Sequence, residues 1–257
     1  MVSMFAITIS AARGDELHWA TNDPEPERTW QPGPEVLKNA YRISQGETDT
    51  IQKLNQAISM CDDYIKAHPD DVSRIDAYVI MAESYSNLGE YQDNDEEKLK
   101  AYEQGKAAAQ KIIDLAPGRW DGWFWWSANV GRIAQIKGIL TSLLMLQPLM
   151  HHLNKAHELA PNSALVLDGL GLMYRELPWI AGGSLTKSKQ YLEKTLSMDP
   201  HFTLARYDLA LTLLAQSNKA EAKKELETLV HEKDPVWLAH YLLWEKPRAG
   251  KLIKELK

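Results

Sequence analysis

From about residue 35 onward, apolar residues recur along this chain at the three- and four-residue spacing of amphipathic helices. Five helix-like stretches end alike, with an apolar or small residue, a short polar step and a proline. The five closing prolines are Pro69, Pro117, Pro161, Pro200 and Pro235. The spacing falls from 48 residues between the first two to 35 between the last two. Because no alternating β-branched run appears in the sequence, the pattern predicts an all-α fold.

Within the repeats, small residues recur where two helices of a pair must touch. In the fourth repeat Leu167 and Leu170 are followed by Gly171 and then Tyr174, and the fifth repeat has the same order around Ala210. This order, with a period approaching about 34 residues, resembles the tetratricopeptide repeat. We therefore expect an α-solenoid of about four to five degenerate tetratricopeptide-type helix pairs.

The two ends of this solenoid depart from the pattern. The first repeat has a convincing second helix only, with Ala57 and Cys61 at core positions. At the other end, Pro235–Lys257 is predicted to form a capping helix that shields the last repeat. The extra residues of the middle repeats lie between their paired helices, and insertions on one side of a solenoid are typical of a binding face.

The N-terminal part of the chain has a different composition. Residues 23–34 contain four prolines and a glycine, which predicts a linker. We therefore divide the chain into an N-terminal segment with its linker, 1–34, and a helical-repeat domain, 35–257. Residues 1–12 are apolar and end in small residues but lack a positively charged start. They are either the remnant of a secretory signal or an ordinary N-terminal helix.

Composition excludes several functions. A net charge of −6 gives no electrostatic basis for binding nucleic acid or an anionic membrane. No apolar run is long enough to span a membrane. The one cysteine, Cys61, cannot form an intrachain disulfide and is predicted to be a buried small hydrophobe.

The densest aromatic cluster lies in Gly118–Arg132. On a helix, Trp123 and Trp126 share one face, while Trp125 and Asn129 share another. An apolar stretch follows, from Ile133 to Leu149. We interpret the two stretches as walls of an internal apolar channel or of an oligomer interface; the alternative is a thick central core.

A second cluster runs from Tyr174 to Ser184. Pro178 should end one helix, Gly182 and Gly183 should form a turn, and Ser184 should cap the next helix. The spacing does not fit a phosphate-binding loop.

The sequence contains no pattern typical of catalysis or metal binding. His151, His152 and His157 lack the spacing of a helical zinc pair, and no nucleophile motif is present. We expect no enzymatic activity, no metal and no cofactor.

Two families resemble parts of the chain. The stretches Leu153–Pro161 and Gly169–Ser188 are similar to the "LG-x-x-Y…LP…GG" pattern of the T-component of TRAP transporters. That resemblance implies a periplasmic helical-repeat protein that associates with a solute-binding protein, lines a pore for apolar ligands and can trimerise. No lipobox cysteine is visible, and Ser184 replaces a commoner acidic residue. The stretch from Trp126 to Trp179 also resembles the regulators of microtubule dynamics, which typically lack the double glycine; we rank this second.

We therefore predict a non-enzymatic scaffold, periplasmic with a cytoplasmic location as the alternative. Its partner would be a solute-binding protein, with an apolar small molecule as a further ligand and a homotrimer as the assembly. The alternative is a general scaffold that docks a peptide or helix in its concave groove, using polar groups that include Arg206. The candidate ligand- or partner-binding residues are Trp123, Trp125, Trp126, Asn129, Arg132, Tyr174, Arg175 and Trp179.

Overall fold

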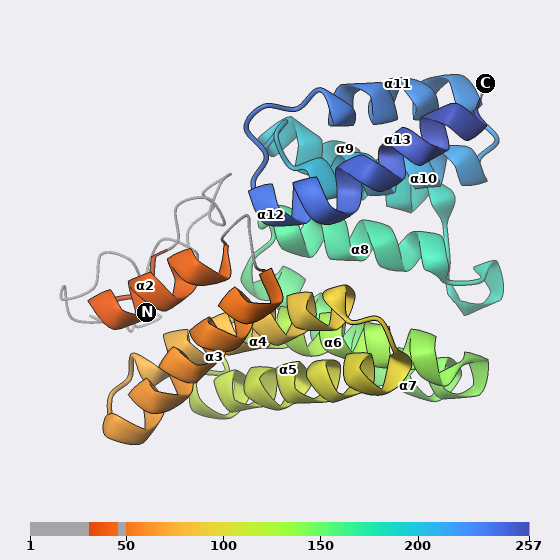
Figure 1. Cartoon of the computed structure of the whole chain (residues 1–257). Helices are drawn as coiled ribbons and strands as arrows, with labels where there is room; N and C mark the ends of the chain where they lie inside the picture. The colour runs from red at the N-terminus through yellow and green to blue at the C-terminus, as the bar shows by residue number, and fades with distance from the viewer. Residues whose placement is uncertain (1–30, 46–49, 257) are drawn as a thin grey trace, which may run out of the picture.

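The computed structural model of the protein describes residues 31–45 and 50–256, so residues 1–12 lie outside the described part. The described residues form helices and no strand, which confirms the all-α solenoid (Figure 1). The five helix pairs are α2 (Glu35–Ser44) with α3 (Thr50–Ala67), α4 (Arg74–Tyr91) with α5 (Asp95–Leu115), α6 (Trp120–Lys137) with α7 (Ile139–Leu159), α8 (Ala164–Glu176) with α9 (Leu185–Met198), and α10 (Thr203–Ala215) with α11 (Lys219–Val230).

The closing prolines mark the ends of the outer helices. Pro69, Pro117, Pro161 and Pro200 each stand two residues beyond the end of α3, α5, α7 or α9. Proline lacks the backbone N–H that a continuing helix needs, so each helix stops and the chain turns into the next repeat. The first repeat also has a first helix, α2, although the sequence pattern predicted only its second.

The insertions of the middle repeats take two forms. In α4, α5, α6 and α7 they lengthen the helices to 18, 21, 18 and 21 residues. Between α8 and α9 they form a loop with a single 3-10 turn, η1 (Trp179–Ala181). Ser184 caps α9 as predicted, since its hydroxyl accepts the Lys187 N–H at 3.3 Å.

The C-terminal segment caps the last repeat as one helical stretch. It runs through α12 (Leu238–His240), a π-helical turn η2 (Tyr241–Glu245) and α13 (Lys246–Glu255). The Tyr241 hydroxyl lies 3.1–3.2 Å from the carbonyl oxygens of Leu229, Val230 and Glu232. It therefore binds the last two carbonyls of α11, which have no partner within their own helix, and one carbonyl of the turn that follows.

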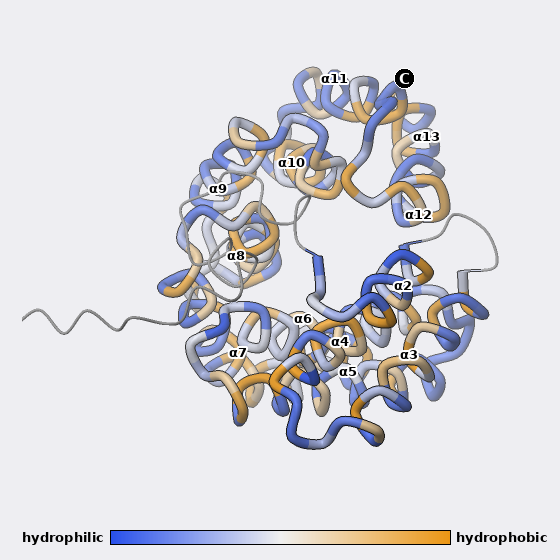
Figure 2. The backbone as a smooth tube through the Cα atoms, turned by 90° about the vertical axis from the view of Figure 1, so that its left-hand side faces the viewer, coloured by the Kyte–Doolittle hydropathy of each residue, from blue (hydrophilic) through white to orange (hydrophobic). Residues whose placement is uncertain are grey.

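The helix pairs follow a strong curve. In Figure 2 the first helices of the pairs, α4, α6, α8 and α10, line the inner side, and α5, α7, α9 and α11 lie outside. α12 comes round toward α2, so the inner face is enclosed on most sides. The core between the two layers extends from Ile75 in α4 to Ala222 in α11.

Candidate functional site

The two aromatic stripes of α6 face two different helices. Trp126 stacks on His152 of α7, with ring centroids 3.8 Å apart and an interplanar angle of 11°. Trp123 lies 5.1 Å from the same imidazole and donates its indole N–H to the Pro117 carbonyl at 2.9 Å. Burial lowers the pKa of His152. These side chains join the two helices of the third repeat.

The other stripe packs against the preceding repeat. Trp125 is almost fully buried and Asn129 is fully buried. Asn129 donates to the Trp125 carbonyl at 2.9 Å and reaches the Ala82 carbonyl of α4 at 3.5 Å. A Cβ atom at Gly105 of α5 would lie 2.4 Å from the Asn129 side-chain oxygen. Trp125 and Asn129 thus lie between repeats, within the core.

Charged side chains from successive inner helices gather along the inner face. Arg132 of α6 binds Glu90 of α4, with 2.7 Å between Nε and Oε1. Arg175 of α8 binds Asp208 of α10, with 2.7 Å between Nη1 and Oδ1, and also its carbonyl at 3.0 Å. The two predicted arginines are therefore each held by an acidic residue of a neighbouring inner helix.

Asp168 of α8 lies among these groups and was missed by the sequence analysis. It is buried, and its Oδ1 atom has no hydrogen-bond partner among the described residues. Burial, followed by the negative charge of Asp208, raises its pKa well above the ordinary value, while Arg175 and Arg132 oppose this shift. Glu245 of η2 adds a further negative charge from across the curve. The sequence does contain one signal for this residue, since Asp168 is the single charged residue in the otherwise apolar run Ala164–Gly171.

A third ionic group lies where the inner helices begin. Arg119 precedes α6 and bridges Asp76 of α4 and Asp121 of α6, with N–O distances of 2.8 Å to each. Asp121 is buried, and burial raises its pKa to about 6 against the opposing charge of Arg119. We call Asp76, Arg119 and Asp121 the entry triad.

The remaining predicted residues lie elsewhere. Tyr174 stacks on Tyr191 of α9 at 5.6 Å, beneath the ammonium group of Lys187. Trp179 projects from the α8–α9 turn with 84% of its surface exposed. The eight predicted residues therefore do not form one site: Arg132 and Arg175 belong to the charged inner face, and the others belong to helix contacts or to the outer edge.

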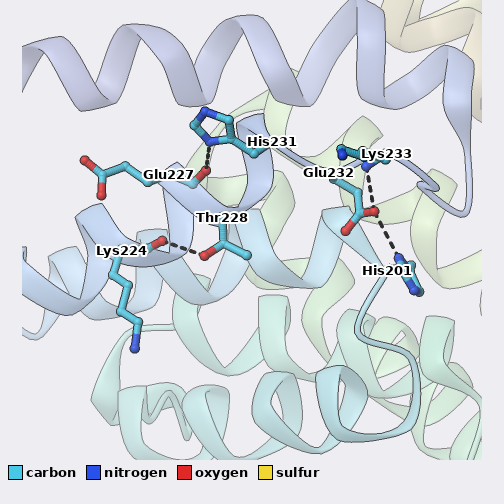
Figure 3. A pocket seen from close by; sticks show the side chains of 7 residues that line it. All are labelled: His201, Lys224, Glu227, Thr228, His231, Glu232 and Lys233. Carbon is cyan, nitrogen blue, oxygen red and sulfur yellow. Dashed lines mark hydrogen bonds and ion pairs between the residues drawn. The ribbon is translucent and has the colours of Figure 1, made fainter.

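A surface pocket lies between α11 and the turn before α10 (Figure 3). On one side of the pocket, Glu232 accepts hydrogen bonds from the His201 ring at 3.0 Å and from the Lys233 and Asp234 N–H groups at 2.8 and 2.9 Å. Burial would raise the pKa of Glu232, but these hydrogen bonds outweigh it and lower the pKa. The Glu232 carboxylate therefore links the turn after α11 to the turn before α10.

The described residues hold neither a metal cluster nor a membrane-spanning helix. Among them, no group of three or more His, Cys, Asp or Glu side chains is arranged to hold a metal ion. No helix in the same part of the chain is both long and apolar enough to cross a membrane.

The paired helices form a tetratricopeptide-type α-solenoid. A thermophilic TPR protein of Thermus thermophilus, TTC0263, is 15% identical with a TM-score of 0.60, over 86% of this chain and 98% of that chain. A crystal structure of MamA is 16% identical with a TM-score of 0.46, over 85% and 99% of the two chains. Yeast Tom70 is 12% identical with a TM-score of 0.37, over 92% and 69%.

Within this class, the chain belongs to the family described as regulator of microtubule dynamics protein 1-3, whose model matches residues 36–234. A comparison with curated proteins finds no match. The family model confirms the second of the two resemblances noted in the sequence. The resemblance to the T-component of TRAP transporters stays a prediction.

Proposed function

We propose that this protein is a non-enzymatic scaffold that binds an extended segment of a protein partner along its inner face. The observation that carries the proposal is the row of charged side chains contributed by successive inner helices. Helix-paired repeats use such concave surfaces for binding. Charged groups on a concave surface fix the register of a bound chain and disfavour wrong partners.

Arg132 is the best-placed residue of this row to contact a partner. One third of its side-chain surface is exposed, whereas Arg175 is only 10% exposed and is held by Asp208. The Arg132 ion pair with Glu90 fixes the guanidinium in place without covering it. An arginine held in this way can bind a carboxylate or a carbonyl of a partner at low entropic cost.

The family name supplies a class of partner to test, namely microtubule protein. We expect the full chain to co-sediment with microtubules and Arg132→Ala to weaken this binding by about five- to tenfold, as for an arginine at the centre of an interface. Lys111→Ala, on the exposed outer face of α5, should leave binding unchanged. Circular dichroism of each variant shows whether the fold is kept.

Photo-crosslinking locates the binding face independently of affinity. A photoreactive residue at position 132 should crosslink to tubulin, and one at position 111 should not. Equal crosslinking from the two faces would contradict an inner binding face. Absence of co-sedimentation would remove microtubules as the partner.

A second candidate function follows from exposed apolar side chains at the turns between paired helices. Leu140, Leu143 and Leu144 at the start of α7 are 57–82% exposed, and Trp179 and Ile180 are 84% and 76% exposed. Apolar clusters of this kind are typical of interaction surfaces. We propose that three copies of the chain associate through this edge to form a homotrimer. Such an assembly accords with a TRAP-type role, in which the protein is a periplasmic accessory that binds a solute-binding protein and an apolar small ligand.

A further inference from the structure

The chain that leads into α2 lies against the inner face of the solenoid. In Figure 2 the short stretch before α2 lies inside the curve. Pro32 is buried, although Gln31 and Gly33 on either side of it are exposed. The Gly33 N–H donates to Oδ2 of Asp76, which is 43 residues further along the chain, at 3.3 Å. A segment predicted to be only a linker therefore contacts the repeat domain at a defined place.

The segment is extended, as its composition requires. Pro34 has φ −71° and ψ 141°, the values of an extended or polyproline conformation. Proline also restricts the residue before it to extended angles, which applies to Gln31 and Gly33. A polyproline segment has no internal hydrogen bonds, so its remaining N–H groups need acceptors from outside. At Gly33 that acceptor is Asp76.

The acceptor Asp76 is also held by a second contact, on its other carboxylate oxygen. The Asp76 Oδ1 atom binds Arg119, and Arg119 binds Asp121 through two further nitrogens at 2.8 and 3.3 Å. The side chains of these three residues are 3–16% exposed, so the entry triad has little freedom to rearrange. This arrangement leaves the second oxygen of Asp76, Oδ2, directed at the Gly33 N–H. Domains that recognise proline-rich segments exploit this preformed extended conformation, because little conformational entropy is lost when it binds.

We propose that the entry triad and the place that buries Pro32 form a recognition site for an extended, proline-containing segment of a partner protein, and that Gln31–Pro34 is a built-in competitor for this site. The inference rests on the proposed inner-face function and names the chemistry of the partner segment. Because the competitor is tethered, its effective concentration is high, and a separate peptide must displace it. Release of Gln31–Pro34 would therefore open the site.

The experiment uses the full chain and a fluorescent peptide with the sequence of residues 23–34. Fluorescence anisotropy measures binding to the wild-type chain and to Pro32→Glu, in which a charge replaces the buried proline. Removing a tethered competitor should tighten peptide binding at least about tenfold. Pro32→Ala, a milder change, should shift affinity in the same direction by a smaller factor.

Two controls test the chemistry of the site. Adding Asp76→Asn to Pro32→Glu should abolish the gain, and a peptide with alanine at positions 32 and 34 should not bind. A Pro32→Glu chain of unchanged helix content that binds the peptide no more tightly than wild type would overturn the proposal, as would equal binding of the alanine peptide. Crosslinking at position 132 tests the inner binding face separately from the peptide experiment. A negative peptide result with positive crosslinking would therefore contradict the proline site and leave the inner binding face supported.

Discussion

At the scale of single residues, close contacts between neighbouring helices depend on glycines. A Cβ atom at Gly89 would lie 2.3 Å from the Tyr102 ring, and one at Gly171 would lie 2.6 Å from Leu192. Contacts this close require movement of the neighbouring side chain. Gly105 is the clearest case, because the atoms it would meet belong to the fully buried Asn129.

Gly105→Ala should destabilise the protein. The new methyl group displaces the Asn129 amide, which holds the Trp125 carbonyl, and overpacking of this kind costs about 1–3 kcal/mol. That cost exceeds the gain of about 0.5–1 kcal/mol expected when alanine replaces glycine within a helix. The free energy of unfolding measured with urea tests this expectation.

Gly250→Ala is the matched control, since Gly250 lies in α13 and nothing is within 4 Å of its Cβ position. This change should stabilise the protein slightly. If the two substitutions shifted the free energy of unfolding in the same direction, the close contact at Gly105 would not be the cause.

The residue pattern predicted some of these contacts and not others. Gly171 and Ala210 were expected where paired helices touch, and both are buried. The burial of Trp125 and Asn129 against the preceding repeat could not be predicted. A helical pattern shows which residues share a face of the helix, but not which repeat packs against that face. The entry triad joins residues 76, 119 and 121, and such pairings depend on how far consecutive repeats rotate.

At the scale of helices, the α2–α3 turn is joined to α4 by a buried acid. Glu83 of α4 is buried and accepts a hydrogen bond from the Gln45 amide at 3.1 Å. Burial raises its pKa from 4.5 to about 7, although the Gln45 hydrogen bond opposes the shift. The folded chain thus binds the Glu83 proton more tightly than the unfolded chain does.

Stability should therefore fall as pH rises from about 4.5 to about 7, because over this range the unfolded state has lost the proton that the folded state keeps. Glu83→Gln removes this group's contribution. The variant should match wild type near pH 4.5 and exceed it at pH 8 by on the order of 3 kcal/mol, at about 1.36 kcal/mol per pKa unit.

Urea unfolding of both chains at pH 5 and pH 8 measures this difference, with Glu96→Gln at an exposed position as the control. A Glu83→Gln chain whose advantage over wild type is the same at both pH values would contradict a raised pKa at Glu83.

At the scale of the whole molecule, the repeat period predicted a solenoid but not its curvature or its exposed edge. The prolines determine where helices end, whereas the curve depends on side-chain volumes between repeats, including the Phe124 ring that would lie 3.0 Å from a Cβ atom at Gly169. The apolar stretch from Ile133 to Leu149 was expected to line a channel, an oligomer interface or a thick core. In the structure Ile133 and Leu149 are buried, whereas Leu140, Leu143 and Leu144 are exposed.

This exposed edge leads to a prediction about assembly. The α6–α7 and α8–α9 turns lie at the same end of consecutive helix pairs (Figure 1), so Leu140, Leu143 and Leu144 share that edge with Trp179 and Ile180. Burying such side chains against another copy removes apolar surface from water at about 25 cal/mol per Å². For the proposed trimer, light scattering should give three times the 29.2 kDa mass of the chain.

Replacing Leu140, Leu143 and Leu144 together by serine should yield the monomer without loss of helix, because these side chains contribute little to the core. Val36→Ser with Val72→Ser is the control, since these exposed residues lie on other parts of the surface and should leave the trimer intact. A wild-type chain that remains at the mass of one copy at high protein concentration would rule out the trimer. The exposed edge would then have to be covered by a different protein or by an apolar ligand.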